Sequence, residues 1–219
     1  MSISDNIQRI KKEIPQSVAL VAVSKTKSNN EIMEAYHAGQ RVFGENKIQE
    51  MTQKSSELPK DIEWHMIGHV QRNKVKYMAP YVALIQGVDS IKLLKEINKQ
   101  AKKEQRIISC LLQMHIAEED TKFGFDEDEL KALLKSGVIQ ELENIQIKGL
   151  MGMATFTENT IQIRKEFKTL KAMFEVIKKD LPDITEVSMG MSGDYSIAIE
   201  EGSTMVRIGS SIFGARNKT

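Results

Sequence analysis

The sequence is poor in the features that mark disulfide-bonded, membrane-spanning and nucleic-acid-binding proteins. One cysteine, Cys110, stands among 219 residues, so neither an internal disulfide nor a cysteine-based metal cluster can form. The longest apolar run, Val18–Val23, has six residues, whereas a membrane-spanning helix needs about 20. Charge of one sign is not in excess either, because 31 Lys and Arg residues are balanced by 30 Asp and Glu residues. We therefore expect no membrane span and no polybasic nucleic-acid-binding face.

The remaining composition is typical of an ordinary globular protein. Hydrophobic residues make up 41% of the chain and charged residues 28%, which supplies enough apolar surface for a packed core. The length fits one domain over residues 1–219. Met1–Asp5 has neither the basic nor the apolar region of a signal peptide. These features predict a single cytoplasmic domain.

Short β-rich runs alternate with segments of helical periodicity along the whole chain. A helix is expected over about residues 3–13, before the first run, and Glu31–Gly39 ends in a glycine that suits a C-terminal cap. Ser90 and Asp126 are placed to cap later helices, and Thr160–Lys179 is the longest periodic segment. The runs expected to form strands are Val18–Val23, Arg41–Phe43, Glu63–Ile67, Val82–Gln86, Ile107–His115, Ile145–Met151, Glu186–Met189 and Thr204–Ile208.

Eight βα repeats are compatible with an open doubly wound sheet or with a closed barrel. An open sheet usually has fewer strands and carries a glycine-rich turn after the first one. Here the first run is followed by Ser24–Lys27, which contains no glycine. The pattern therefore predicts an α/β protein with a single (β/α)8 TIM barrel.

In such a barrel the carboxyl ends of all strands meet at one mouth, and Lys25 follows the first run there. One interpretation is a lysine whose aliphatic stem lies along the barrel while its ammonium reaches water. The other is an amine in a partly desolvated pocket, where a lowered pKa makes it nucleophilic towards an aldehyde. Lys27, two positions further on, is expected to be a charge at the rim.

Two glycine- and serine-rich turns follow the seventh and eighth runs, at Gly190–Gly193 and Gly209–Ser211. Glycine lets backbone amides approach an anion, and barrels often bind phosphate after these two strands. The alternative is that they are only tight turns, which favour the same residues. Arg207 lies within the last run, where an inward guanidinium would need a partner or a ligand acceptor.

The histidines and methionines near the strand ends give weaker signals. His65 and His69 have the spacing of a zinc helix, but no glutamate follows the first one and the segment resembles a strand entering a loop. No metal site is therefore expected. Methionines at the mouth are expected to pack adaptably, some of them around a flat ligand: Met151, Met153, Met189 and Met191.

Six separated motifs, in one order, resemble the pyridoxal phosphate homeostasis protein family. They are Val21–Lys27, Phe43–Asn46, Trp64–His69 with Gln71 and Asn73–Lys74, Gly149–Met151, Ser188–Ser192, and Gly202–Arg216. The family resemblance implies a barrel like the N-terminal domain of alanine racemase, the fold type III of pyridoxal phosphate proteins. One departure from the family pattern is Ser196, where an acidic residue is common.

The resemblance also implies a binding site for pyridoxal 5′-phosphate. Lys25 matches the lysine that forms an internal aldimine, and Arg207 matches the arginine facing the pyridine nitrogen. Residues expected at the phosphate are Ser192, Gly209 and Ser210, while Asn46 and His65 are expected near the ring. Met191 is also expected to bind the cofactor.

Three functions remain open at this point. The resemblance favours a non-catalytic protein that stores or delivers pyridoxal 5′-phosphate or limits its free concentration. Its partners would be pyridoxal phosphate-dependent apo-enzymes, and the chain would be a monomer or weak dimer. An arginine at the pyridine nitrogen leaves the ring a poor electron sink, and no tyrosine is identifiable as a second acid or base. The alternatives are an amino-acid racemase-like enzyme and a barrel for another phosphorylated metabolite.

Overall fold

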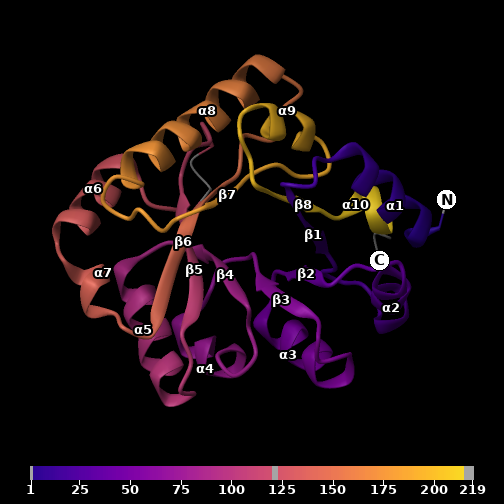
Figure 1. The fold of residues 1–219 in the computed structure, drawn as a ribbon, viewed down its shortest axis with the longest axis horizontal. Coiled ribbons are helices and arrows are strands. Elements are labelled where there is room, and N and C mark those ends of the chain that lie inside the picture. Colours follow the sequence, from indigo (N-terminus) through magenta and orange to yellow (C-terminus); the bar gives the residue numbers. More distant parts are fainter. Residues whose placement is uncertain (1, 120–122, 215–219) are drawn as a thin grey trace.

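The computed structural model describes residues 2–119 and 123–214, and its strands form a closed parallel barrel (Figure 1). Each strand pairs with the next in chain order, and β8 pairs with β1, so the predicted (β/α)8 architecture is confirmed. Ala215 and Arg216 of the C-terminal motif lie outside the described residues. The strands are β1 Ala19–Val23, β2 Val42–Glu45, β3 Glu63–Met66, β4 Leu84–Val88, β5 Ile108–Met114, β6 Ile145–Gly152, β7 Glu186–Ser188 and β8 Met205–Ile208.

Helices surround the barrel (Figure 1), and several of them begin at a residue whose side chain caps the first turn. Ser2 and Asp5 form a reciprocal capping box, and Ser90 and Asp126 cap the helices that the sequence predicts there. The helices are α1 Ile3–Glu13, α2 Asn29–His37, α3 Ile48–Glu57, α4 Val75–Met78, α5 Ile91–Lys103, α6 Glu127–Lys135, α7 Val138–Glu141, α8 Thr160–Ile177, α9 Tyr195–Glu200 and α10 Ser210–Phe213, with a 3-10 turn η1 Arg72–Lys74.

Alternation along the strands separates two apolar layers. Trp64 and Met66 of β3 belong to the large core between the barrel and its helices, so His65 between them points into the barrel. The barrel interior holds a smaller apolar cluster of Val21, Leu84, Leu111, Met151 and Met205. The interior therefore combines a few apolar side chains with buried polar ones, and the polar ones bear on the site described below.

Closure of the barrel brings the two ends of the chain together. Strand β1 pairs with β8 with Val21 opposite Arg207, which places the residues that follow both strands at the same edge. Helix α1 then packs against α10, where the Asn6 side-chain amide donates to the Ile212 carbonyl at 2.9 Å. The first and last described helices thus support the same side of the barrel mouth.

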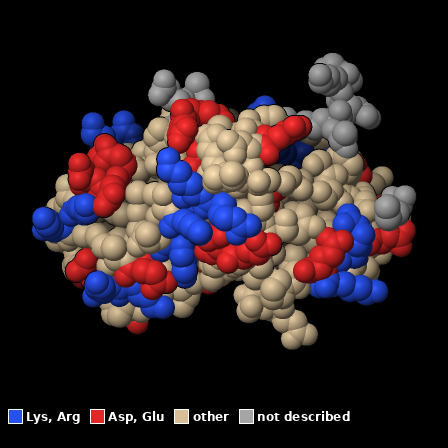
Figure 2. Space-filling view, turned by 90° about the horizontal axis from the view of Figure 1, so that it is seen from above, with Lys and Arg blue, Asp and Glu red and all other residues tan. Residues whose placement is uncertain are grey.

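Charges of both signs are interspersed over the face shown in Figure 2. Arg164 on α8, for example, pairs with Glu200 and Glu201 at the end of α9. Among the helices of the described residues, none has the length and apolar character needed to cross a bilayer.

Candidate functional site

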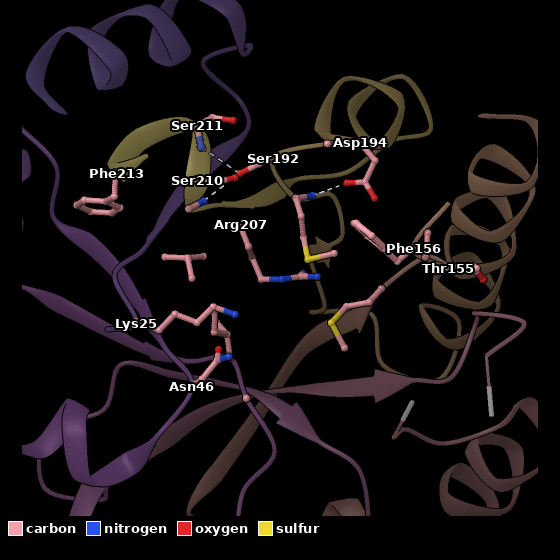
Figure 3. A pocket seen from close by; sticks show the side chains of 18 of the residues that line it. Lys25, Asn46, Thr155, Phe156, Ser192, Asp194, Arg207, Ser210, Ser211 and Phe213 are labelled. Carbon is pink, nitrogen blue, oxygen red and sulfur yellow. Dashed lines mark hydrogen bonds between the residues drawn. The ribbon is translucent and has the colours of Figure 1, made fainter. Parts of the chain in front are cut away.

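A cavity of about 710 Å³ opens at the carboxyl ends of the strands, which is the end of a barrel where functional sites lie. The loops after several strands line it, and Figure 3 shows Lys25 and Asn46 facing the serine turns across the cavity. All but one of the residues predicted for the site line the cavity: Lys25, Asn46, Met191, Ser192, Arg207, Gly209 and Ser210. The exception is His65.

Lys25 lies in a tight turn directly after β1. The Lys27 amide donates to the Ser24 carbonyl at 3.0 Å, and Thr26 has φ +64°. That left-handed conformation at the third position of a turn normally requires glycine. The turn directs the Lys25 side chain into the cavity, where its amine points towards Arg207 (Figure 3).

The turns after β7 and β8 are linked through one hydroxyl. The Ser192 Oγ accepts hydrogen bonds from the amides of Gly209 at 3.2 Å and Ser211 at 3.4 Å (Figure 3). Gly190 has φ +96°, and a Cβ there would lie 2.6 Å from the Ala198 Cβ, so this turn needs glycine. Amides and hydroxyls therefore converge on one side of the cavity, and such groups bind anions.

Arg207 supplies a buried positive charge at the base of the cavity. Only 3% of the residue is exposed, and its guanidinium donates to the Ser188 Oγ at 2.6 Å and the Gly152 carbonyl at 3.0 Å. Burial lowers the pKa of Arg207 to about 10, although the nearby Asp194 carboxylate opposes this shift. The guanidinium stays charged at neutral pH and can face a neutral acceptor on a ligand.

His65 lies beneath the cavity and not in its wall. Arg207 donates to the Ser188 Oγ, the Ser188 hydroxyl donates to the Gln86 Oε1 at 2.7 Å, and the Gln86 amide lies 3.0 Å from the His65 Nδ1. We call these four residues the floor chain. Burial lowers the pKa of His65 to about 4, so its neutral ring accepts at Nδ1. The structure thus separates His65 from the cavity wall by the rest of the floor chain.

The structure adds residues that the sequence interpretation does not assign to a ligand site. His69 lines the cavity after β3, its Nδ1 lies 2.9 Å from the Asp89 Oδ2, and its ring stacks on Phe123 at 4.5 Å. Thr155 and Phe156, from the loop after β6, also line the cavity. The position of each residue after a strand was a signal that could have found it, and His69 also stands in the Trp64–His69 motif. Nothing in the sequence pairs His69 with Asp89.

The donor set fits a small phosphorylated aldehyde. Lys25 supplies a primary amine, the turns at Ser192 and Gly209 supply neutral anion donors, and Arg207 supplies a fixed cation. In the described part of the chain, no group of three or more His, Cys, Asp or Glu side chains is arranged to hold a metal ion.

Comparisons with known proteins agree with this geometry. Residues 1–217 match the family model "Alanine racemase, N-terminal domain". A pyridoxal phosphate homeostasis protein of Vibrio alginolyticus is 38% identical and is aligned over 99% of this chain and 98% of its own length. The corresponding protein of Escherichia coli K12 is 35% identical over 93% of this chain and 88% of its own.

Solved structures give the same result. PipY of Synechococcus elongatus, solved with PLP bound, has a TM-score of 0.90 and 33% identity, covering 97% of this chain and all of that one. Alanine racemase of Bartonella henselae, at 19% identity and TM-score 0.73, is similar in fold; the match covers 99% of this chain and 60% of the racemase. The full-length relatives therefore place the chain in the pyridoxal phosphate homeostasis protein family.

Proposed function

We propose that this protein binds pyridoxal 5′-phosphate and holds it without turning over a substrate, as part of pyridoxal phosphate homeostasis. The observation that carries the proposal is the convergence of the Lys25 amine, the Ser192 and Gly209 turns and the Arg207 guanidinium on one cavity. These groups match the aldehyde, the phosphate and the ring nitrogen of that cofactor. The family membership and the PLP-bound state of PipY support the same assignment.

Each chemical part of the cofactor has its own group in the cavity. The cofactor supplies an aldehyde, which condenses with a primary amine to form a C=N bond with loss of one water. Lys25 is the amine that we assign to this attachment. The amides and hydroxyls around Ser192 and Ser210 hold the phosphate, and Arg207 faces the ring nitrogen. Asn46 and Met191 contact the ring from the cavity wall.

Two features support a carrier and not a catalyst. The Arg207 guanidinium remains charged at neutral pH and cannot accept a proton from the ring nitrogen as a carboxylate would, so the ring stays unprotonated and is a poor electron sink. None of the described residues that line the cavity is a tyrosine. The hydroxyls of Tyr36, Tyr81 and Tyr195 instead pair with Asp61, Thr52 and Glu13.

A carrier must also release its ligand, and we assign pyridoxal phosphate-dependent apo-enzymes as the acceptors. The cavity opens at the strand ends, so a bound molecule can leave without unfolding of the barrel.

We place the protein in the cytoplasm as a monomer or weak dimer. Size-exclusion chromatography with light scattering tests the assembly state, and a stable higher oligomer would contradict it.

Borohydride reduction followed by peptide mass mapping tests the proposal. The purified protein, incubated with pyridoxal 5′-phosphate, should be yellow and should carry the reduced cofactor on Lys25. Lys25→Ala should lose the absorption band and the label while still binding phosphate-bearing analogues. A colourless wild-type protein, or a label on surface lysines alone, would overturn the proposal.

One observation favours a second candidate, an amino-acid racemase-like enzyme. His69 and Asp89 form a pair at the cavity wall, and a histidine oriented by a carboxylate is a common acid or base in catalysis. Chiral analysis after incubation of the loaded protein with L-amino acids distinguishes the candidates. Turnover well above that of free cofactor, lost in His69→Ala, would replace the carrier assignment with this one.

A further inference from the structure

A buried ionic cluster lies directly behind the turn that carries Lys25. It consists of Ser24 and Thr26, which flank the lysine, together with Glu45 at the end of β2 and Glu50 and Lys54 on α3. We call these five residues the Lys54 cluster. None of its side chains except those of Thr26 and Glu50 is appreciably exposed, and the cluster lies outside the set of residues assigned to ligand contact.

The Lys54 ammonium is the centre of the cluster. It donates to the Ser24 carbonyl at 2.9 Å, to the Glu45 Oε1 at 2.8 Å and to the Glu50 Oε1 at 2.7 Å. All three donors of the ammonium are thereby used. Since Ser24 directly precedes Lys25, Lys54 fixes the backbone on one side of the cavity lysine.

The two glutamates accept further hydrogen bonds from the same turn. The Glu50 Oε1 also accepts the Thr26 amide at 2.6 Å, and the Glu45 Oε1 also accepts the Ser24 hydroxyl at 2.6 Å. Both neighbours of Lys25 are therefore bound to one network through their backbones. The contacts from helix α3 and strand β2 to this turn span 21 to 30 positions in sequence.

The turn needs such support because its backbone is strained. Thr26 has φ +64°, a conformation that is unfavourable for a β-branched residue and persists only where the surroundings impose it. Without the cluster, the turn would relax towards negative φ at Thr26, and the peptide units next to Lys25 would rotate. The direction in which the Lys25 side chain leaves the backbone would change with them.

Burying the charged groups of the cluster costs free energy, so the cluster is not simply a stabilising ion pair. The Glu45 Oε2 is buried and has no hydrogen-bond partner among the described residues, and a buried ion pair often stabilises less than apolar residues of the same volume would. A contribution to stability therefore does not explain the buried, unsatisfied oxygen of Glu45. The contacts of the cluster with the turn around Lys25 explain it better.

We propose that Lys54 is a positioning residue that, through Ser24 and Glu50, holds the strained turn so that the Lys25 amine meets the ligand aldehyde. This inference rests on the proposed function, because it concerns how Lys25 is presented. It assigns Lys54 no contact with the ligand. Its consequence is that the cluster affects covalent attachment and leaves non-covalent binding of the phosphate almost unchanged.

Two ligands separate these effects. Pyridoxal 5′-phosphate can attach to Lys25, whereas pyridoxine 5′-phosphate has a hydroxymethyl group in place of the aldehyde and can only bind non-covalently. Lys54→Met and Glu50→Gln should each weaken retention of the aldehyde by about tenfold, because each removes the charged hydrogen bond that holds one neighbour of Lys25. Affinity for pyridoxine 5′-phosphate should stay within about twofold. Lys60→Met is the matched control, because among the described residues Lys60 donates only to the Ser55 and Ser56 carbonyls at the end of α3.

A second comparison keeps the test decisive if Lys54→Met folds poorly. Glycine tolerates the conformation of Thr26, so Thr26→Gly should relieve the strain and reduce the effect of Glu50→Gln. Equal weakening of both ligands, unchanged retention of the aldehyde, or an undiminished effect in the Thr26→Gly background would overturn the proposal. Failure of the proposed function is distinct, since the wild-type protein would then show no covalent label on Lys25.

Discussion

The floor chain and the Lys54 cluster are two buried polar networks that serve the same cavity by different chemistry. The floor chain lies inside the barrel and connects a cation, Arg207, through neutral side chains to a neutral His65. The Lys54 cluster lies between the barrel and α3 and joins one ammonium to two carboxylates. In the floor chain each residue donates to the next, from Arg207 to His65. In the Lys54 cluster one carbonyl and two carboxylates accept from the same ammonium.

The difference follows from the surroundings of each network. Strands surround the barrel interior, so each charge there is costly, and the residues that follow Arg207 in the floor chain are all neutral. In the outer layer, Glu50 keeps 24% of its side chain exposed, which lowers the cost of an ion pair. The two networks therefore have opposite responses to acid, because protonation is unfavourable at His65 and favourable at Glu45.

The largest expected effect concerns acid and the floor chain. The pKa of His65 in the folded protein is about 4, below its ordinary 6.5, so folding opposes its protonation. Stability should be unaffected above about pH 6.5 and should fall between there and about pH 4, by roughly 3 kcal/mol in total. His65→Gln should remove this dependence in urea denaturation over a pH series. The exposed His37→Gln is the control, and an equal pH profile in both variants would contradict the prediction.

The next effect comes from interrupting the floor chain at its middle. Gln86→Leu leaves the Ser188 O–H without an acceptor and the His65 Nδ1 without a donor, which should cost about 2–3 kcal/mol of unfolding free energy. Gln100→Leu is the matched control, because Gln100 is also buried but donates to Glu96 on an outer helix. If both variants lost the same stability, the floor chain would have no special role.

A smaller effect is expected where neither network reaches. Ser192→Ala removes the hydroxyl that accepts from the Gly209 and Ser211 amides. The affinity for pyridoxine 5′-phosphate should fall about tenfold, and the free energy of unfolding should change little. Isothermal calorimetry measures the affinity. Ser56→Ala on the exposed face of α3 is the control, and unchanged affinity in Ser192→Ala would remove this turn from the phosphate site.

The smallest effect has the opposite sign to that of His65. Burial raises the pKa of Glu45 above its ordinary value, while Lys54 and Ser24 oppose the shift, and the Glu50 carboxylate and the Tyr81 hydroxyl lie close by. The ionised form is therefore disfavoured in the folded protein, so wild type should lose stability relative to Glu45→Gln as pH rises above 4.5. Denaturation midpoints at several pH values test this slope, and a slope of the same sign as for His65 would remove the contrast between the networks.

The sequence was sufficient for the barrel because each strand is a local apolar run. Helix caps such as those at Ser90 and Asp126 also depend on residues close by in the sequence, so local patterns identify them. The sequence did not predict helix α3. Ile48–Glu57 contains Ser and Thr, which are weaker helix formers, and Lys47 provides no side-chain cap at its start. The short helices α9 and α10 have too few residues to show a period.

The sequence predicts those cavity residues that lie at the ends of strands. It does not predict the floor chain or the Lys54 cluster behind them. Ser188 and Gln86 are 102 positions apart, and Lys54 meets Ser24 across 30 positions. No local pattern encodes such pairs, because they arise from closure of the barrel and from the packing of α3. His65 shows the same limit, since strand alternation puts it inside the barrel but does not give its depth below the cavity.

The packing of α1 against α10 has a consequence for how the site is assembled during synthesis. A growing chain has the Lys25 amine early, but the Gly209 and Ser211 amides on the anion side are synthesised much later, and β8 must close against β1 before they take their places. The nascent polypeptide therefore carries the Lys25 amine before it has the groups that select its ligand, and selectivity begins only after β8 has been synthesised and has paired with β1.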